Sequence, residues 1–599
     1  MTTHSDATLG DVLRDRASRS GDLPGHWTLS SDGRWQSHSW SELHARVEAL
    51  ARGCTRLGLR PGDRVAFIAT GTSDWDIAHW AVLAARGVVV GIDAHAPAEM
   101  LSALLELATP SALVVDRTSR LDGVRPELAA SFRFVVTLGE DDPSQPALGP
   151  RVVSVRALAA EAESEAAPRA ADSRPVPEDP AWIVFTSGTT GRPKGVLFRH
   201  RQIRAAMEAI LDAFNDISTG DRLASWLPLS NPFQRIVNLC AAALGAQTYY
   251  VEDPRTIMEH LPAIRPHVFI GVPRFYEKFH AVVTGRMAAR GGLAAGMAHW
   301  ALTTGERAST LRRQGLPVPP MTQAALAVAD GLVLRRIREA FGGRLRYLVS
   351  GSAPMPTWLL ERLDAMGLRV LEAYGLSECI VPVATNRANA LRFGTVGRAM
   401  KGVETRLGPD GELLIRSIGT FDGYVGALDE GGAVDQDGWL ATGDLAQIDS
   451  DGFVRLVGRK SEVFKTSTGR RVAPQAVEAA LRSVAGVEHA AVFGAGRATL
   501  LALVAVAPDA DTTATSLRHA VRAASRALPD YQRPAGLVVT RQPLTIETGE
   551  LTGNLKLRRQ VVGERYADAL AQLARVVDDP ARLSEASASL PSGLELVLV

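Results

Sequence analysis

The sequence predicts an α/β protein with more than one domain, and three observations lead to this prediction. Apolar stretches of strand length alternate with stretches whose apolar residues recur at helical spacing. The chain has 599 residues, more than one hydrophobic core usually serves. Hydrophobic residues make up 46% and charged residues 22% of the chain, as in an ordinary globular protein. Such alternation is typical of buried parallel strands covered by helices.

The N-terminal part carries the clearest alternation. Residues 41–57 have apolar side chains at helical spacing, and a Gly-Asp turn then leads into a predicted strand at 64–69. Short apolar runs at 112–115 and 134–138 are bounded by turn residues and predict two further strands. Residues 159–180 are rich in Ala, Glu, Ser and Pro and are interpreted as a surface connection.

The second half of the chain changes character twice. Residues 273–341 predict at least two helices, because the proline-rich segment 316–320 interrupts the helical pattern. After residue 402, short runs with Gly-Asp turns predict antiparallel strands, and from residue 460 a smaller α/β unit follows. Its expected helices are 474–484 and 516–528, and its expected strands are 488–493 and 500–507. The last twenty or so residues, rich in Ser and Ala, are expected to be a loosely held tail.

Charge and cysteine usage exclude several classes. The formal net charge is +1, which argues against a dedicated nucleic-acid partner. No secretory signal and no uninterrupted apolar stretch of membrane-spanning length is recognised, so no transmembrane segment is expected. Cys54, Cys240 and Cys379 lack metal-ligand spacing and fit a reducing compartment. We therefore expect a cytoplasmic enzyme.

One loop suits a polyphosphate. After an apolar strand at 182–185, residues 186–195 read TSGTTGRPKG. The glycines let backbone amides approach an anion closely, the hydroxyls add donors, and Lys194 adds a positive charge. The lysine follows a proline and precedes no Ser or Thr, so this is not a Walker A loop. The alternative is a flexible surface loop.

This stretch resembles the phosphate-binding signature of the adenylate-forming superfamily, which includes acyl-CoA synthetases, peptide-synthetase adenylation domains and luciferases. The resemblance implies ATP as a substrate and assigns Lys194 a catalytic role. The positions that it implies for binding the triphosphate are Thr186, Ser187, Gly188, Thr189, Thr190, Gly191 and Lys194.

A second stretch, LEAYGLSE at 371–378, resembles the second core motif of that superfamily. The resemblance implies that Tyr374 packs on adenine and that Ser377 and Glu378 face the phosphates, with Glu378 reaching Mg²⁺. A carboxylate beside a triphosphate is unfavourable unless a cation lies between them, which supports Glu378 as a metal ligand. The other nucleotide-binding positions implied here are Glu372, Ala373 and Gly375.

Further motifs follow the order of the family. Residues 350–354, after a strand at 345–349, resemble the turn that lines the adenine pocket, with Ser352, Ala353 and Pro354 as implied contacts. An ordinary strand-to-helix turn and a solvated glutamate at a loop end are the alternatives for this segment and for Glu378.

The ribose and hinge motifs lie further along the chain. Residues 438–445 resemble the ribose motif and imply that Asp444 accepts the ribose hydroxyls. Residues 458–465 resemble the hinge motif, in which Arg459 also contacts ribose and Lys460 lies at the hinge.

Residues 549–559 resemble the C-terminal lysine motif. The resemblance implies that Lys556 is catalytic and is brought onto the carboxylate and the α-phosphate, where its charge would stabilise the displacement.

The resemblance covers nearly the whole chain and implies its domain organisation. The fold class expected from it is α/β, with a large N-terminal domain of layered sheets and helices plus a small β-barrel-like part, at residues 1–458. A smaller, mobile α+β C-terminal domain is expected at 459–599. The implied reaction joins a carboxylate to ATP, giving an acyl-adenylate and pyrophosphate, followed by transfer to a thiol.

Three segments resemble the long-chain fatty acyl-CoA synthetase branch: residues 226–230, residues 464–469 and the long helical stretch after residue 278. This implies a long or bulky apolar acid and coenzyme A. Asn231 and Gln234 depart from that branch, which usually has His and Glu there, and residues 91–97 also differ. Both departures lie where the acyl group or its entrance is expected.

Two other functions remain open from the sequence. One is an adenylating enzyme of specialised metabolism that uses a carrier protein, an amine or an unusual small acid such as nitrite. The other is a binding protein with a decayed ATP site, against which the retained motif residues argue. A small-molecule acid is the expected partner, and peripheral membrane contact and a homodimer are both compatible with the sequence.

Overall fold

The computed structural model describes residues 7–139, 150–163, 174–186, 193–425, 434–508, 510, 512–545, 548–551, 557–588, 590–591 and 593–599. The chain divides into two compact units. Unit 1 consists of Met1–Thr405 and Ile415–Leu440, and unit 2 consists of Arg406–Leu414 and Ala441–Val599. Among the described residues, no helix is both long and apolar enough to cross a membrane.

Unit 1 is built on an eight-stranded sheet with the order β19-β9-β8-β4-β3-β5-β6-β7. Strands β8, β4, β3, β5, β6 and β7 run parallel, whereas β9 and β19 are antiparallel to their neighbours. The strands are β19 (Tyr424–Val425), β9 (Lys194–Arg199), β8 (Pro180–Thr186), β4 (Val88–Ile92), β3 (Arg64–Ile68), β5 (Ala112–Val115), β6 (Phe134–Thr137) and β7 (Arg151–Ser154). The predicted strands at 64–69, 112–115 and 134–138 are confirmed.

Helices bury both faces of this sheet, which explains the continuous apolar runs of its strands. On β3, Phe67 contacts Trp75 of α3 (Ser73–Ala84), with ring centroids 4.9 Å apart. The alternate residues Ala66 and Ile68 pack into a core that also contains Leu101 and Leu105 of α4 (Ala98–Ala108). The predicted helix at 41–57 is α2 (Trp40–Arg56), whose N-terminus is capped by the Ser39 side chain.

Two smaller sheets complete unit 1. The order of the five-stranded sheet is β12-β13-β14-β15-β16, and its first three strands are parallel. The order of the four-stranded sheet is β10-β11-β1-β2. The strands are β12 (Val268–Gly271), β13 (Tyr347–Ser350), β14 (Val370–Leu376), β15 (Cys379–Thr385), β16 (Arg398–Ala399), β10 (Arg222–Ser225), β11 (Gln247–Tyr250), β1 (Pro24–Leu29) and β2 (Trp35–Ser39).

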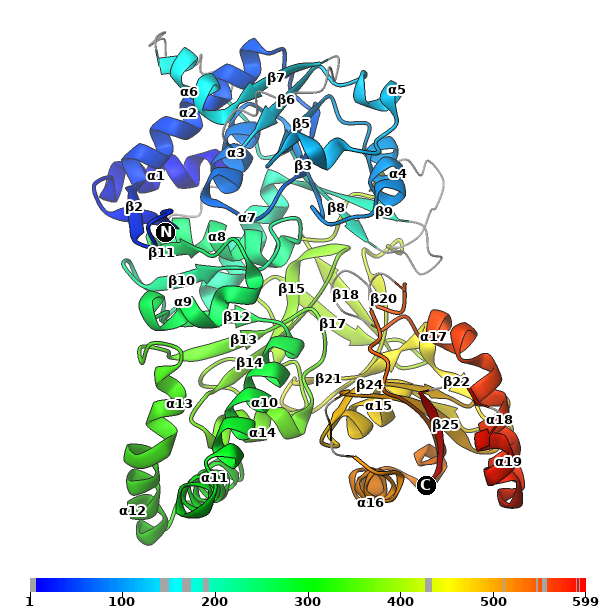
Figure 1. Cartoon of the computed structure of the whole chain (residues 1–599). Helices are drawn as coiled ribbons and strands as arrows, with labels where there is room; N and C mark the ends of the chain where they lie inside the picture. Colours follow the sequence, from blue (N-terminus) through cyan, green and yellow to red (C-terminus); the bar gives the residue numbers. More distant parts are fainter. Residues whose placement is uncertain are drawn as a thin grey trace. The chain divides into compact units, whose positions relative to one another are not determined.

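The helical stretch predicted at 273–341 forms a helical insertion between β12 and β13 (Figure 1). Its proline-rich segment separates two helices as predicted, and Pro320 takes the first helical position, where its missing N–H leaves no helical bond unmade. A π-helical segment then continues the chain. The members are α10 (Pro273–Ala289), α11 (Gly292–Arg313), α12 (Pro320–Ala329), η4 (Asp330–Leu334) and α13 (Arg335–Glu339).

Antiparallel strands follow residue 402, as predicted. They form a four-stranded sheet in the order β17-β18-β20-β21, in which β20 and β21 pair antiparallel. The strands are β17 (Val403–Leu407), β18 (Glu412–Ser417), β20 (Leu440–Ile448) and β21 (Val454–Arg459).

Unit 2 contains the smaller α/β layer predicted after residue 460. Its main sheet has the order β24-β25-β26-β27, and Leu500 to Val506 of β25 are buried throughout. The elements are β24 (Val487–Phe493), β25 (Leu500–Val506), β26 (Pro534–Thr540), β27 (Leu594–Leu598), α15 (Pro474–Arg482), α16 (Ala514–Ala524), α17 (Arg559–Arg565), α18 (Ala567–Asp578) and α19 (Leu583–Ala588).

The prediction of a loosely held C-terminal tail is wrong. Strand β27 pairs antiparallel with β26, from Gly536–Leu598 to Thr540–Leu594. Leu596 and Val597 are buried in the hydrophobic cores on the two faces of this sheet. The Ser/Ala-rich composition concealed a terminal strand of only five residues, LELVL.

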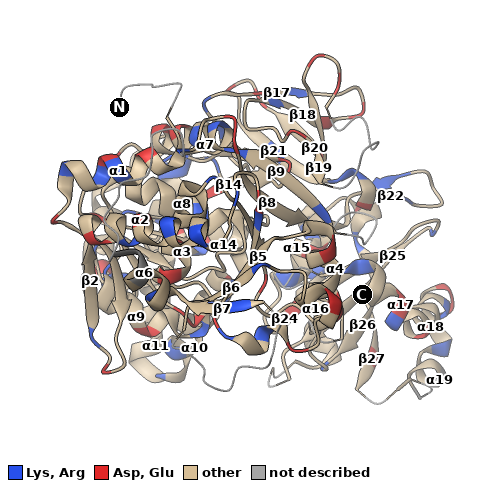
Figure 2. Cartoon of the chain, turned by 90° about the horizontal axis from the view of Figure 1, so that it is seen from above, with Lys and Arg blue, Asp and Glu red and all other residues tan. Residues whose placement is uncertain are grey.

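Charges of both signs lie close together over most of the chain. Helices α1 (Leu9–Ser20), α17 and α18 each carry acidic and basic residues, as the view in Figure 2 shows. This mixture is consistent with the small net charge of +1.

Candidate active site

The predicted phosphate loop connects β8 to β9 in unit 1. These strands pair antiparallel from Pro180–Arg199 to Thr186–Lys194, so Thr186 and Lys194 face each other where the hairpin opens. Trp182 and Ile183 of β8 are fully buried and anchor the hairpin in the eight-stranded sheet. The predicted contacts Ser187, Gly188, Thr189, Thr190 and Gly191 lie outside the described residues.

Lys194 is brought to an aromatic residue that the sequence did not single out. Strand β19 pairs with β9, with Tyr424 opposite Val196 and Val425 opposite Gly195. This pairing places the Lys194 Nζ atom 4.8 Å from the centroid of the Tyr424 ring. An ammonium at this distance from a ring face is attracted by the ring quadrupole.

The same tyrosine reaches the predicted metal ligand. The Tyr424 hydroxyl donates a hydrogen bond to Oε1 of Glu378 at 3.2 Å. Glu378 lies in the turn between β14 and β15, and its backbone carbonyl accepts a hydrogen bond from the Phe421 amide at 2.9 Å. The Phe421 ring packs against the Tyr424 ring, with centroids 4.8 Å apart. Unit 1 thus brings Lys194 and Glu378 together through Tyr424.

The predicted adenine-binding residues come from two neighbouring parallel strands. Ser350 of β13 is in register with Glu372 of β14, and Tyr374 follows on β14. Ser352 has a left-handed backbone (φ 69°), which is rare for a residue other than glycine. At this strand end Ser352, Ala353 and Pro354 are exposed. Ala373, Gly375 and Ser377 are exposed or half-buried along the same edge.

Glu372 is an unusual buried carboxyl group. Its side chain is 6% exposed, and Oε1 accepts a hydrogen bond from the Met355 amide at 3.3 Å. Burial raises the pKa of Glu372 to about 8, although the Met355 amide opposes this shift. Among the described residues, neither Glu372 Oε2 nor the buried Ser350 hydroxyl has a hydrogen-bond partner. Two buried polar atoms without partners, on residues in register on neighbouring strands, fit a site for the polar edge of a heterocycle.

Unit 2 contains the predicted ribose and hinge residues. Asp444 of β20 is paired in register with Arg459 of β21, and Arg459 Nε lies 2.9 Å from Asp444 Oδ1. The Asp444 side chain is 9% exposed, whereas that of Arg459 is 44% exposed. Arg459 also donates to the Thr442 carbonyl at 3.1 Å, and the Thr442 hydroxyl accepts a hydrogen bond from the Asp444 amide. The two predicted ribose contacts therefore lie together.

Lys460 is held by two carboxylates. Its Nζ atom lies 2.7 Å from both Asp410 Oδ2 and Glu412 Oε2, and these hydrogen bonds raise the pKa of Lys460 above its usual range. Glu412 in turn accepts a hydrogen bond from the Gly443 amide at 2.8 Å. These contacts connect Lys460 to the turn before β18 and to the first residue of that strand.

Lys556 lies outside the described residues, as does the segment 552–556. The flanking residues Leu551 and Leu557 form an isolated antiparallel bridge in unit 2. Glu550 before them is fully buried and paired with Arg565 at 2.6 Å.

Asn231 and Gln234, the two departures from the long-chain branch, have structural partners. The Asn231 side chain caps α8 (Pro232–Leu244) by accepting from the Phe233 amide at 3.0 Å. The Gln234 carbonyl oxygen accepts from the amides of Trp226 and Leu227, at 3.4 and 3.3 Å. Its amide nitrogen donates to Asn238 at 3.0 Å.

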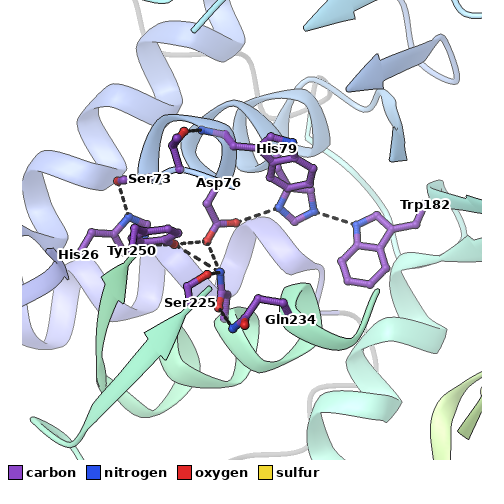
Figure 3. A network of polar contacts seen from close by, with 11 residues as sticks. His26, Ser73, Asp76, His79, Trp182, Ser225, Gln234 and Tyr250 are labelled. Carbon is purple, nitrogen blue, oxygen red and sulfur yellow. Dashed lines mark hydrogen bonds and ion pairs between the residues drawn. The ribbon is translucent and has the colours of Figure 1, made fainter. Parts of the chain in front are cut away.

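Asn238 links Gln234 to a buried polar network (Figure 3). It donates to Asp76 Oδ2 at 3.3 Å, and the Tyr250 hydroxyl donates to the same oxygen at 2.5 Å. His79 lies 3.3 Å from the other Asp76 oxygen and accepts a hydrogen bond from the Trp182 indole at 2.8 Å. Gln234 thus completes a hydrogen-bond network of the core that extends to β8.

Comparison with known proteins identifies the family. The family model described as AMP-binding enzyme matches residues 14–425, and the one described as AMP-binding enzyme C-terminal domain matches residues 462–575. The long-chain-fatty-acid–CoA ligase FadD15 of Mycobacterium bovis is 30% identical over 560 residues, covering 90% of this chain and 92% of the relative. The long-chain-fatty-acid–CoA ligase ACSBG2 of Gallus gallus is 25% identical, covering 100% of this chain and 85% of the relative.

Solved structures share the fold. The A domain of carboxylic acid reductase from Segniliparus rugosus, in complex with AMP and a co-purified carboxylic acid, superposes with a TM-score of 0.74 at 22% identity, covering 96% of this chain and 95% of that chain. The anthranilate CoA ligase AuaEII in complex with anthranoyl-AMP gives a TM-score of 0.73 at 18% identity, and the match covers 94% of this chain and 98% of that chain. Because the family model and the Mycobacterium bovis relative match most of the chain, the chain belongs to the AMP-binding enzyme family, and it has the fold of the adenylate-forming enzymes.

Proposed function

We propose that this protein is an AMP-forming acyl-CoA synthetase that activates a long-chain or bulky apolar carboxylic acid. A carboxylate oxygen of the acid attacks the α-phosphorus of ATP, and pyrophosphate leaves. The thiol sulfur of coenzyme A then attacks the acyl carbonyl, loses its proton, and AMP leaves. The observation that carries the proposal is the cluster of Lys194, Tyr424 and Glu378 at the mouth of the β8–β9 hairpin.

The residues of this cluster are suited to a triphosphate. Lys194 and the backbone and hydroxyl groups from Thr186 to Gly191 would bind the phosphates. Glu378 would hold Mg²⁺, an ion that commonly takes one or two carboxylates together with substrate phosphates and water. When bound, the ion would neutralise charge on the phosphate oxygens.

Tyr424 would position the other two residues. Its hydroxyl directs one carboxylate oxygen of Glu378, and its ring face holds the Lys194 ammonium close to that carboxylate. Because the orientation is preset, less side-chain freedom is lost when the nucleotide binds. We therefore assign Tyr424 the role of a positioning residue.

Adenine would bind at the ends of β13 and β14. With its pKa raised to about 8, Glu372 is protonated at neutral pH and both donates and accepts hydrogen bonds. The adenine edge offers an amino donor beside a ring-nitrogen acceptor, which matches a neutral carboxyl group. Tyr374 would pack on the ring. The remaining contacts proposed here are Ser352, Ala353, Pro354, Ala373, Gly375 and Ser377.

Residues of unit 2 have proposed roles as well. Asp444 would accept the ribose hydroxyls with Arg459 beside it, and Lys556 would bind the carboxylate and the α-phosphate. We also propose that the domain boundary lies after residue 458, and that residues 459–599 form a mobile domain with its hinge at Lys460.

The proposed setting is the cytoplasm. All three cysteines are buried and none is in a disulfide, and burial raises the pKa of Cys240 to about 12 and that of Cys379 to about 11. Protonated, shielded thiols of this kind fit a reducing compartment. The homodimer stays a prediction, which sedimentation equilibrium of the purified chain would test.

A pyrophosphate-release screen tests the function. Acids of increasing chain length, an aromatic acid and nitrite are each incubated with ATP and Mg²⁺, with and without coenzyme A. We expect turnover that needs coenzyme A and is highest with long or bulky apolar acids. Release that is unaffected by coenzyme A but increased by an amine or a carrier-protein thiol would instead establish the enzyme of specialised metabolism. No release with any acid would overturn both.

A further inference from the structure

Apolar side chains are exposed unevenly along the chain. Among the described residues, half of the large apolar side chains that are exposed belong to the helical insertion, which spans only residues 273–340 of a chain of 599. These are Val282, Leu293, Met297, Trp300, Leu316, Met321, Val328 and Leu332. Exposed apolar residues gathered in this way indicate an interaction surface.

The spacing of these residues follows the helices. Leu293, Met297 and Trp300 recur at positions i, i+4 and i+7 of α11 and therefore lie along one face. Met321 and Val328 lie seven residues apart on α12 and likewise share a face, and the Met321 side chain is 85% exposed. Neither stripe is covered by another described element, although each helix also has a buried face that packs into unit 1.

The connection between α11 and α12 forms an apolar tip. From Leu316 to Met321 the sequence is LPVPPM, without a charged or hydrogen-bonding side chain. Leu316 is 50% exposed, and Arg312 precedes the tip on the last turn of α11. In Figure 1 the tip lies between the end of α11 and the start of α12, away from the sheets of unit 1.

The insertion is also strongly basic. Residues 273–340 contain ten Lys and Arg against four Asp and Glu, whereas the whole chain has a net charge of only +1. The rest of the chain therefore has an excess of acidic residues. Arginines of the insertion are exposed as well. They include Arg286, Arg290, Arg307, Arg312, Arg335 and Arg336.

A cavity of about 710 Å³ lies within the insertion and its packing partner α14 (Thr357–Ala365). Leu316, Val318, Leu326 and Leu334 line its apolar part, and its polar part is lined by Arg312, Gln323, Asp330, Arg338 and Asp364. Arg338 is paired with Asp330 at 2.7 Å. The volume lies in the range of sites that hold one small molecule, and the lining combines apolar side chains with polar groups of both charges.

We propose that the helical insertion is a docking surface for an anionic phospholipid bilayer, with the apolar tip and Trp300 entering the interface. Burial of apolar side chains would supply part of the binding free energy, and the arginines would be attracted to anionic headgroups. Tryptophan suits the interface because one end of its ring system is apolar and its N–H remains hydrated. The excess of positive charge favours a negatively charged bilayer at this surface. A second copy of this chain is disfavoured, because its insertion would be equally positive.

Vesicle flotation of the full chain tests this inference. The vesicles consist of phosphatidylcholine alone or of equal parts of phosphatidylcholine and phosphatidylglycerol. We expect binding to the anionic vesicles that weakens with added salt, since charges at a surface are screened. Wild-type protein that stays unbound, or that binds both vesicles equally at low and high salt, would overturn the proposal.

Matched variants locate the surface. The double variant Leu316→Gln/Met321→Gln is compared with Met100→Gln, which changes an exposed methionine on α4 outside the insertion. The variant Arg307→Gln/Arg312→Gln is compared with Arg60→Gln/Arg522→Gln. We expect the first variant of each pair to lower vesicle partitioning. For the arginine variant, the expected decrease is about fivefold for each arginine removed.

The controls should bind as wild type, and all four variants should keep wild-type pyrophosphate release with a dissolved acid. Equal loss in a variant and its control would overturn the assignment of the surface. Loss of a dimer in the tip variant, without any vesicle binding by the wild type, would show that a second copy covers this face instead.

Discussion

The Tyr424 hydroxyl donates a hydrogen bond to Glu378 at 3.2 Å, and this bond connects two motifs that lie far apart in the sequence. On the opposite strand of the same sheet edge, Lys194 contacts the Tyr424 ring. The interaction makes Tyr424 the link between the phosphate-binding hairpin and the proposed metal ligand.

Tyr424→Phe should lower kcat/KM about tenfold, because a hydrogen bond to a charged carboxylate is lost while the ring contact with Lys194 remains. The Mg²⁺ concentration that gives half-maximal rate should rise, whereas KM for the acid should stay unchanged. Steady-state kinetics over a Mg²⁺ series measures both. Tyr424→Leu should lose more, because it also removes the ring.

The control for this variant is Tyr531→Phe, which changes an exposed tyrosine in unit 2. An unchanged Mg²⁺ dependence in Tyr424→Phe would rule out the positioning role, even if overall activity fell.

Glu372 should make stability and nucleotide binding depend on pH. Its pKa lies at about 8 in the folded state, above the usual value of 4.5, so unfolding at neutral pH releases a proton. Its contribution to stability is therefore fully present below pH 4.5 and is lost as the pH rises to about 8. At about 1.4 kcal/mol per unit, the loss is several kcal/mol at most.

Glu372→Gln keeps a neutral side chain of the same shape and should remove this dependence. Urea midpoints are measured at pH 6 and pH 9, below and above the pKa of about 8. The difference between the two midpoints should be smaller for the variant than for wild type. KM for ATP should also rise above pH 8 in the wild type only. Parallel pH profiles in the two proteins would contradict the protonated carboxyl group.

Gln234→Ala should destabilise unit 1 by about 2 to 4 kcal/mol, because it leaves the amides of Trp226 and Leu227 and the Asn238 side chain without their partner. Thermal unfolding monitored by circular dichroism measures the change. Gln314→Ala, at the exposed end of α11, should stay within about 0.5 kcal/mol of wild type. Equal melting temperatures of the two variants would show that the network carries little stability.

Lys556→Ala should slow acyl-adenylate formation by about 100-fold or more, since a charge that stabilises the displacement at the α-phosphorus is removed. Pyrophosphate exchange measures this half-reaction. Conversion of a prepared acyl-adenylate with coenzyme A should remain close to wild type, as should both half-reactions of the control Lys401→Ala. Equal slowing of both half-reactions would show that the lysine does not act on the first one specifically.

The local elements were largely predictable from the sequence. The strands at 64–69, 112–115 and 134–138 and the helix at 41–57 have strong periodicity, and the structure contains each of them. The terminal strand β27 was missed, since a five-residue strand becomes recognisable only through its pairing with β26.

For the site, the sequence by itself determined the residue types and their order, because glycine-rich and acidic motifs depend on local backbone and charge. Only the tertiary structure decided which of these residues meet. The role of Tyr424 depends on the pairing of β19 with β9, a contact between segments more than 200 residues apart. The raised pKa of Glu372 and the structural role of Gln234 depend on burial, and burial arises only when distant strands and helices pack around a side chain.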